Sequence, residues 1–317
     1  MDTLSEFDRP VFKVLPVNDS GQSKGNQSGI LIPEALDAYF PQLKADLTAE
    51  NPTSDETITA ILIAEGKHIE TVETRYQYQT RAGERGIERR ITGNLGEWHK
   101  KSVEGDMVLI ERNLADRTLY RLTLIKKGSD DFKKIQAASS GKKWGPANPL
   151  EPPVSEQELK DAENQQKAHE ATPLKNLFDN DAATTESRTK RIARSRAFQK
   201  SVGEYYGGKC AVCGLGFIDV SDRGEVEAAH IVPRGKKGAD DARNGVALCR
   251  SHHWAFDRGL WAINAKGEIE VAPKAAGKGS NDLLKVFVGN QLAQPNPSSM
   301  APVKEAFEWH KKEVFNR

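Results

Sequence analysis

The chain has 317 residues, enough for two ordinary domains and a linker, and its 46 basic and 45 acidic residues nearly cancel, so only local charge clusters can indicate partners. The mean hydropathy is −0.63, and no apolar run approaches the ~18 residues of a membrane-spanning helix. The first residues also lack the basic and apolar segments of a signal peptide, so we expect a cytoplasmic protein without a membrane partner.

Residues 1–137 form the first predicted domain, which is rich in strands. A β-branched apolar run at residues 58–63 indicates a strand. Residues 106–111 and 118–125 have the pattern of two strands joined as a hairpin. Residues 33–40 begin with a proline, which is favoured in the first turn of a helix, and they predict one short helix.

The composition changes at residues 138–186, which we expect to be a linker. Residues 138–153 are rich in Gly, Pro and Ser, as linkers are. Ser155 and Glu158 have the spacing of a capping box, which predicts a helix running to about residue 170. That helix has almost no apolar face, so we expect either a spacer or a partly disordered segment.

The second domain is predicted at residues 187–317 and begins with a helix. One face of this helix repeats every fourth residue, at Arg194, Phe198, Val202 and Tyr206. Gly207 and Gly208 follow and are expected to end it. A hairpin and a last helix are predicted further along, at residues 261–263, 268–271 and 303–315.

The three cysteines of the chain have the spacing of metal ligands. Cys210 and Cys213 form a C-x-x-C pair, and Cys249 and His252 form a C-x-x-H pair. Three thiolates and one imidazole complete the tetrahedral set of a structural zinc, which leaves no position open for catalysis. The alternative is a set of buried, inert cysteines beside a coincidental histidine, and the paired spacing argues against it.

Three motifs lie between and beside these cysteines. Residues 227–233 read EAAHIVP, residues 240–245 read DDARNG, and residues 249–259 read CRSHHWAFDRG. Over about residues 194–263 the chain resembles the HNH nuclease family, in the branch with an additional zinc site that includes McrA-like restriction enzymes. The resemblance implies a ββα-metal nuclease domain.

The resemblance also implies a catalytic set, which is His230, Asn244 and His253. His230 matches the general base, and an imidazole can take a proton from water near neutral pH. Asn244 matches a residue that orients the histidine or holds its loop, and that in some members binds the metal. His253 and Asp257 are four residues apart on one helix face and match the ligands of a catalytic Mg or Mn ion.

Two features qualify this assignment. His252 and His253 point about 100° apart on a helix, so one can face the zinc and the other the catalytic ion. Many family members carry Asp or His at the position of Ala229, where alanine cannot bind a metal. The ion would then rest on His253, Asp257, water and the substrate phosphate, with Asn244 as a further candidate.

The amino-terminal region has motifs of its own. Residues 18–33 are rich in Gly, Ser and Asn, residues 39–43 read YFPQL, and residues 89–92 read RRIT. Their order over about residues 13–110 resembles the effector domain of EcoRII-like restriction enzymes, a pseudobarrel related to the plant B3 DNA-binding domain. A flexible surface loop is the alternative for residues 18–33, and a solvated charged loop for the later arginines.

In that family two arms grip the major groove of a DNA duplex. Carried over, the arms are residues 18–27 and about 81–99, where Asn and Gln can read adenine and Arg can read guanine. The DNA-binding residues this implies are Asn18, Ser20, Lys24, Asn26, Gln27, Arg81, Arg85, Arg89, Arg90 and Trp98. Trp98, with Tyr76 and Tyr78, could stack on a modified or extruded base, although aromatic residues of a barrel more often belong to the core.

These features predict an α+β protein with a B3-like pseudobarrel, a linker and a C-terminal ββα-metal HNH domain with structural zinc. The expected function is a restriction endonuclease that binds double-stranded DNA, either modification-dependent or specific for an unmodified sequence. The second version needs a companion methyltransferase, and cutting both strands favours a homodimer. A catalytically dead HNH-fold DNA-binding protein and a nonspecific nuclease or toxin are the alternatives.

Overall fold

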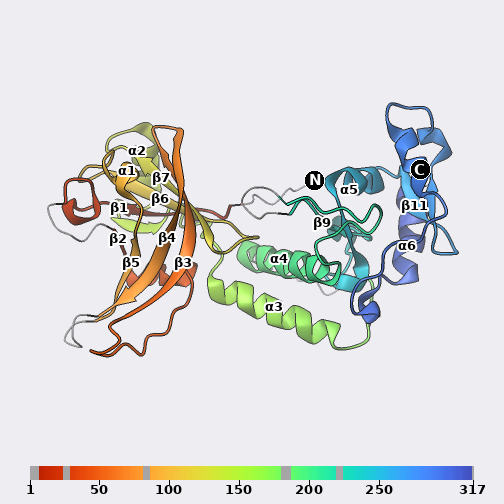
Figure 1. The fold of residues 1–317 in the computed structure, drawn as a ribbon, viewed down its shortest axis with the longest axis horizontal. Helices are drawn as coiled ribbons and strands as arrows, with labels where there is room; N and C mark the ends of the chain where they lie inside the picture. Colours follow the sequence, from red (N-terminus) through yellow and green to blue (C-terminus); the bar gives the residue numbers. More distant parts are fainter. Residues whose placement is uncertain (1–6, 24–28, 81–85, 180–186, 219–223, 316–317) are drawn as a thin grey trace. The chain divides into compact units, whose positions relative to one another are not determined.

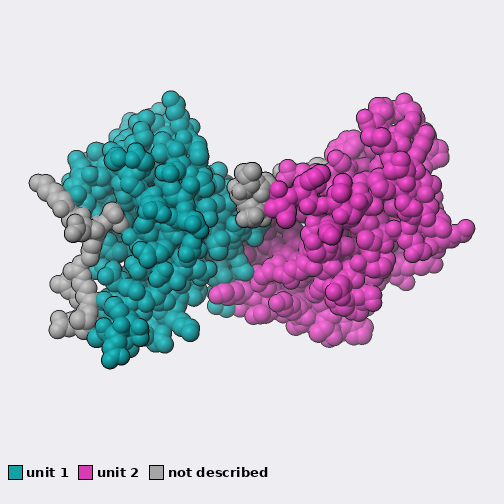
Figure 2. All heavy atoms as spheres, viewed as in Figure 1, with its two compact units in different colours: residues 1–158 teal, residues 159–317 magenta. Residues whose placement is uncertain are grey.

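The structure is a computed structural model that describes residues 7–23, 29–80, 86–179, 187–218 and 224–315. The chain divides into two compact units, residues 1–158 and 159–317, which are coloured separately in Figure 2. Among the described residues, no helix combines the length and the apolar character needed to cross a membrane.

The first unit is built on one curled, eight-stranded sheet (Figure 1). Its strands are β1 (Val11–Val14), β2 (Ile30–Ile32), β3 (Thr53–Ala64), β4 (Lys67–Gln79), β5 (Glu88–Thr92), β6 (Met107–Arg112), β7 (Leu119–Ile125) and β8 (Trp144–Pro146). They lie in the order β2-β5-β4-β3-β7-β6-β1-β8, and among the strand pairs that the structure describes in this sheet the β3–β7 pair alone is parallel. Its helices are α1 (Gly96–His99), α2 (Asp130–Ala138) and the 3-10 helices Val17–Asp19 and Glu34–Tyr39.

The expected hairpin is confirmed as β6 and β7, and the apolar run at residues 58–63 lies within β3. The short helix expected at residues 33–40 is the 3-10 helix Glu34–Tyr39. In the longest strand, β4, buried side chains alternate with solvent-facing ones, which is the pattern of a sheet with one face in the core. The α+β class and the β-rich first unit are therefore confirmed.

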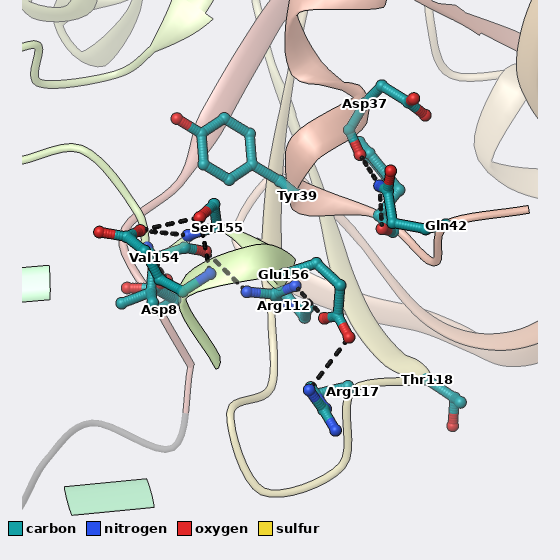
Figure 3. A network of polar contacts seen from close by, with 12 residues as sticks. Asp8, Asp37, Tyr39, Gln42, Arg112, Arg117, Thr118, Val154, Ser155 and Glu156 are labelled. Carbon is teal, nitrogen blue, oxygen red and sulfur yellow. Dashed lines mark hydrogen bonds and ion pairs between the residues drawn. The ribbon is translucent and has the colours of Figure 1, made fainter. Parts of the chain in front are cut away.

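The segment expected to be a linker begins inside the first unit. β8 pairs with β1, so residues 144–146 are part of the sheet. Figure 3 shows the contacts that hold the chain just after it: Arg112 bonds the carboxylate of Glu156 at 3.0 Å and the carbonyl of Val154 at 2.7 Å. Arg117 bonds Glu156 at 3.0 Å, and the Val154 amide donates to Asp8 at 2.6 Å. Buried polar contacts therefore fix a segment that has the composition of a linker.

The polar helix is α3 (Glu156–Glu170), and its predicted capping box is present. The Ser155 amide donates to the Glu158 carboxylate at 2.9 Å, and the Glu158 amide donates to the Ser155 hydroxyl at 3.1 Å. The helix is neither a free spacer nor disordered, because its polar side chains contact α4: Glu163 pairs with Lys200 at 2.9 Å, and the Tyr205 hydroxyl donates to Glu170 at 2.6 Å.

The second unit contains a ββα arrangement packed beside a long helix. Its elements are α4 (Arg188–Tyr205), β9 (Glu227–His230), β10 (Gly245–Leu248), α5 (Arg250–Asp257), β11 (Trp261–Ile263), β12 (Ile269–Val271), α6 (Lys304–His310) and a π-helical turn, Lys311–Phe315. Its 3-10 helices are Arg234–Lys236, Ala242–Asn244, Pro273–Ala275, Asn281–Phe287 and Ser298–Met300. The predicted first helix, second hairpin and last helix are all confirmed.

Close packing places α4 directly against the β9–β10 pair. Phe198 and Val202 of α4 are fully buried, as their helical spacing predicts. A Cβ atom on Gly245, the first residue of β10, would lie 2.7 Å from both side chains, so only glycine permits this approach. Gly245 pairs with His230 across the two strands, and the same contact therefore positions the histidine.

Candidate active site

The three cysteines and His252 form one cluster, as their spacing predicts. Their ligand atoms all lie within 4.8 Å of one another. Nδ1 of His252 lies 3.1 Å from Sγ of Cys249 and 3.5 Å from Sγ of Cys210. Burial raises the pKa of Cys210, but hydrogen bonds from His252 and from backbone amides outweigh it and bring the pKa to about 6. The donor set and its spacing are compatible with a structural zinc ion.

The fold brings the two halves of this cluster together from distant parts of the chain. Cys210 and Cys213 lie in a turn after α4, and the Ala211 amide between them donates to Ala247 of β10 at 2.8 Å. Cys249 is the N-cap residue of α5, and His252 is in its first turn. A metal here would therefore tie the turn after α4 to the helix that carries His253.

His230 ends β9 and is held on two sides. Its ring stacks on Phe198, with centroids 3.8 Å apart, and its Nε2 lies 2.9 Å from Oδ1 of Asp240. Asp240 also pairs with Arg194 and Arg234, at 3.4 Å each. Burial raises the pKa of Asp240, but the hydrogen bond with His230 and the two arginine charges outweigh it and lower the pKa. An ionised Asp240 therefore faces the ring.

Asn244 is fully buried, and its side-chain hydrogen bonds within the described structure join it to backbone groups. Its Oδ1 accepts from the Val232 amide at 2.9 Å, and its Nδ2 donates to the carbonyls of Val232 and Ala239 at 3.0 and 2.9 Å. These contacts are those of a residue that holds the loop after His230. No contact joins Asn244 to His253 or Asp257 among the described residues, so the geometry does not support the metal-binding alternative.

His253 lies between two carboxylates. Its Nδ1 is 2.8 Å from Oε2 of Glu227, and its Nε2 is 3.7 Å from Oδ2 of Asp257. Burial lowers the pKa of His253, but the hydrogen bond to Glu227 and the two negative charges outweigh it and raise the pKa. Ala229 is fully buried in the apolar core of this unit. Strand β9 therefore approaches His253 through Glu227 and not through the residue before His230.

The exposed face of α5 beside His253 is basic and aromatic. Arg250, Trp254 and Arg258 are spaced by four residues, so they lie along one side of the helix. The side chain of Arg250 is 68% exposed, Trp254 is 52% exposed, and the Arg258 guanidinium lies 5.9 Å from the centre of the Trp254 ring. An exposed tryptophan between two arginines is typical of nucleic-acid contacts.

Few of the residues that were expected to bind DNA in the first unit have an exposed side chain in the described structure. Lys24, Asn26, Gln27, Arg81 and Arg85 lie outside the described residues. Asn18 is exposed, but Ser20 is buried, and its hydroxyl donates to the Val17 carbonyl at 2.9 Å.

The two remaining arginines of the second expected arm are engaged within the fold. Arg89 pairs with Asp37 at 3.3 Å and lies 5.2 Å from the centre of the Tyr78 ring. Arg90 pairs with Glu88 at 3.3 Å. Of the assigned residues that the structure describes, Asn18 therefore presents the most open side chain.

The expected DNA contact through Trp98 is wrong in this structure. Trp98 is fully buried, and its indole N–H donates to the Ile63 carbonyl at 3.1 Å. Tyr76 and Tyr78 are also buried, and their hydroxyls bond Asp37 at 2.6 and 2.8 Å. These three residues belong to the core of the sheet, as aromatic residues of a barrel usually do, because burying a large ring stabilises the fold.

Several residues at the site were not assigned roles from the sequence. Glu227 and Asp240 stood within the quoted motifs, but contacts made across the fold give them their histidine partners. Arg250, Trp254 and Arg258 also stood within a motif. Their spacing of four residues on an expected helix was the signal that could have identified this face.

Comparison with known proteins locates one domain. Residues 210–264 match the HNH endonuclease family. No curated protein matches the chain. Among solved structures, it is similar to the modification-dependent TagI restriction endonuclease, with 13% identity, 88% of this chain and 79% of that chain covered, and a TM-score of 0.33. It is also similar to a mutant B3 domain of the UbaLAI restriction endonuclease with cognate DNA. The identity is 23%, the match covers 44% of this chain and 82% of that chain, and the TM-score is 0.29.

Proposed function

We propose that this chain, a DNA nuclease with an HNH endonuclease domain at residues 210–264, is a metal-dependent restriction endonuclease. The observation that carries the proposal is the placement of the motif residues in one ββα arrangement. His230 ends the first strand, Asn244 fixes the loop that follows, and His253 lies on the helix.

The proposed general base is His230. Asp240 accepts the N–H of Nε2, which leaves the lone pair of Nδ1 to take a proton from the attacking water. The carboxylate also stabilises the imidazolium that forms, as in other carboxylate–histidine pairs. Phe198 restricts the ring from its face. His230 is thus held in one tautomer and one orientation before substrate binds.

The proposed catalytic ion is Mg or Mn, held by Nε2 of His253 and a carboxylate oxygen of Asp257. These two atoms are 3.7 Å apart, within reach of one ion that accepts donors at about 2.0–2.2 Å. When bound, such an ion would supply charge that neutralises the phosphate and stabilises the leaving oxygen. His253 and Asp257 would orient the ion. Asn244 would hold the loop after His230 and would not bind the ion. The proposed ion of the cysteine cluster is zinc.

Substrate contacts are proposed on both units. Arg250 and Arg258 can neutralise phosphates beside the cleaved bond, and Trp254 can stack on a base or sugar. In the first unit, the resemblance of residues 13–110 to B3 effector domains supports a role in reading DNA. The arms at residues 18–27 and 81–99 remain the proposed DNA contacts of this unit. Asn18 is the most exposed of their assigned residues that the structure describes, and Trp98 is left out because it is buried.

The resemblance to McrA-like enzymes supports a modification-dependent enzyme that cuts methylated or hydroxymethylated DNA, and we propose this form. A type II enzyme that cuts an unmodified sequence, and works with a methyltransferase, is the second candidate. Each strand needs its own cut, which favours a homodimer on DNA.

A plasmid cleavage assay tests the function. Otherwise identical unmethylated, cytosine-methylated and hydroxymethylated DNA would be incubated with the full chain and Mg²⁺ or Mn²⁺. Discrete fragments from modified DNA alone are expected. Discrete fragments from unmodified DNA would identify the type II candidate, and degradation of every substrate would identify a nonspecific nuclease. Binding without any cleavage would overturn the nuclease proposal.

Replacing Asp240 is expected to slow cleavage without weakening DNA binding. Asp240→Asn removes the charge that stabilises the imidazolium, and its amide N–H₂ can favour the wrong tautomer of His230. We expect the single-turnover cleavage rate to fall by about 10²- to 10³-fold. The rate would be measured at several pH values, beside DNA affinity by fluorescence anisotropy.

Asp179→Asn is a matched control for this variant. Asp179 contacts the same two arginines, Arg194 at 3.8 Å and Arg234 at 3.3 Å, but among the described residues the hydrogen-bond partner of His230 is Asp240 and not Asp179. If both variants lost the same activity, the arginine network rather than the His230 contact would explain the loss.

A further inference from the structure

Glu227 occupies a defined place at the start of β9. It pairs with Leu248 of β10, and its side chain reaches His253 on α5. One oxygen, Oε2, lies 2.8 Å from Nδ1 of His253, and the other, Oε1, lies 3.4 Å from Nε of Arg250. Both oxygens of the carboxylate therefore have partners on α5, which limits how it can turn.

The two nitrogens of His253 face different groups. Nδ1 faces Glu227, and Nε2 faces Asp257 at 3.7 Å. A carboxylate accepts hydrogen bonds, so the arrangement favours the tautomer with its proton on Nδ1 and a lone pair on Nε2. In metal sites a ligating histidine usually donates its second N–H to a carboxylate in this way, which fixes the ring and raises its basicity.

We propose that Glu227 is a positioning residue that fixes the tautomer and orientation of His253, so that Nε2 of His253 and Asp257 bind one divalent cation. This inference rests on the proposed function of the same site. It also explains how β9 serves the site although Ala229 provides no ligand. Glu227 is not itself a ligand in this arrangement, because it contacts the nitrogen of His253 that faces away from Asp257.

The affinity of the full, zinc-loaded chain for Mn²⁺ tests this role without any cleavage measurement. The free Mn²⁺ signal in electron paramagnetic resonance would be titrated for the wild type, Glu227→Ala and Glu227→Gln. We expect about a 10- to 100-fold weaker affinity for Glu227→Ala, and a smaller loss for Glu227→Gln, whose amide oxygen can still accept from Nδ1. Glu225→Gln is the matched control, since within the described structure His253 bonds Glu227 and pairs with Asp257 but not with Glu225, and its affinity should equal that of the wild type.

A spectroscopic readout separates positioning from a general structural effect. In the metal-free catalytic site, at a pH where the ring is neutral, ¹⁵N chemical shifts of His253 should report a proton on Nδ1 in the wild type and a mixture of tautomers in Glu227→Ala. A wild-type proton on Nε2, or an unchanged Mn²⁺ affinity of Glu227→Ala, would overturn the inference.

His253→Ala and Asp257→Asn distinguish this failure from failure of the proposed function. Both variants remove a proposed ligand and should lose more affinity than Glu227→Ala. If they bind Mn²⁺ like the wild type, the cation site itself is wrong, and the role of Glu227 is wrong with it. If they lose affinity while Glu227→Ala does not, only the positioning role is overturned.

Discussion

His230→Ala is expected to abolish detectable plasmid cleavage while DNA binding stays unchanged. The variant removes the imidazole that takes the proton from water and leaves Asp240 without its ring partner. Loss of general-base catalysis predicts a rate lower by about 10²- to 10⁴-fold. Single-turnover cleavage of a labelled duplex would measure the rate, and anisotropy with the same duplex would measure the affinity.

His68→Ala is the control for this prediction. His68 is an exposed histidine of the first unit, and its ring contacts Thr71 at 2.9 Å. The His68→Ala variant should cleave DNA at the wild-type rate. If His230→Ala also cleaved at the wild-type rate, another group would be the base. If it instead lost DNA affinity in proportion to its rate, His230 would act in binding and not in proton transfer.

Removing the proposed structural zinc is expected to unfold residues 159–317 selectively. The cluster joins the turn after α4 to the first turn of α5, and Cys210 is fully buried in the apolar core of this unit. Metal binding to such clusters is coupled to folding and contributes about 10–16 kcal/mol in isolated zinc-finger peptides. Mass spectrometry under native conditions should find one zinc per chain, and Cys210→Ser should lose it.

Thermal unfolding followed by circular dichroism would show which unit is affected. The first unit has its own sheet and core, so its transition should remain in Cys210→Ser while the transition of residues 159–317 is lost. Adding excess Mg²⁺ should not restore it, because thiolates favour zinc. A Cys210→Ser protein that keeps both transitions, or a wild type that purifies without zinc, would contradict a structural zinc site.

Short-range sequence patterns predicted many of the helices and strands of this protein and the residues of its cysteine cluster. The spacing of Cys210, Cys213, Cys249 and His252 predicted their cluster, since two-residue gaps turn both members of each pair toward one point. The four-residue repeat along α4 predicted one helix face, on which Phe198 and Val202 are buried, and the strand patterns at residues 106–111 and 118–125 predicted β6 and β7. Ser155 and Glu158 likewise formed the expected capping box. Each of these patterns lies within a short segment, where local geometry suffices, although folding is still needed to bring the Cys210–Cys213 pair to the Cys249–His252 pair.

Other features depend on residues brought together from distant parts of the chain. Composition suggested that residues 138–153 link two domains, but β8 pairs with β1, and Arg112 binds the segment that follows. Trp98 lies in a segment that was predicted to contact DNA, but its ring is buried in the core of the first unit. The local sequence could predict neither the pairing of β8 nor the burial of Trp98, because each depends on residues that are far away in sequence.

The chemistry of the candidate site divides in the same way. The sequence by itself determined which residue types are present and which of them share a helix face, as His253 and Asp257 do. Only the tertiary structure decided that Asp240 faces His230, that Glu227 faces His253, and that Asn244 bonds the backbone of a loop. A histidine's tautomer is set by the group opposite each ring nitrogen, and folding brings those groups into place.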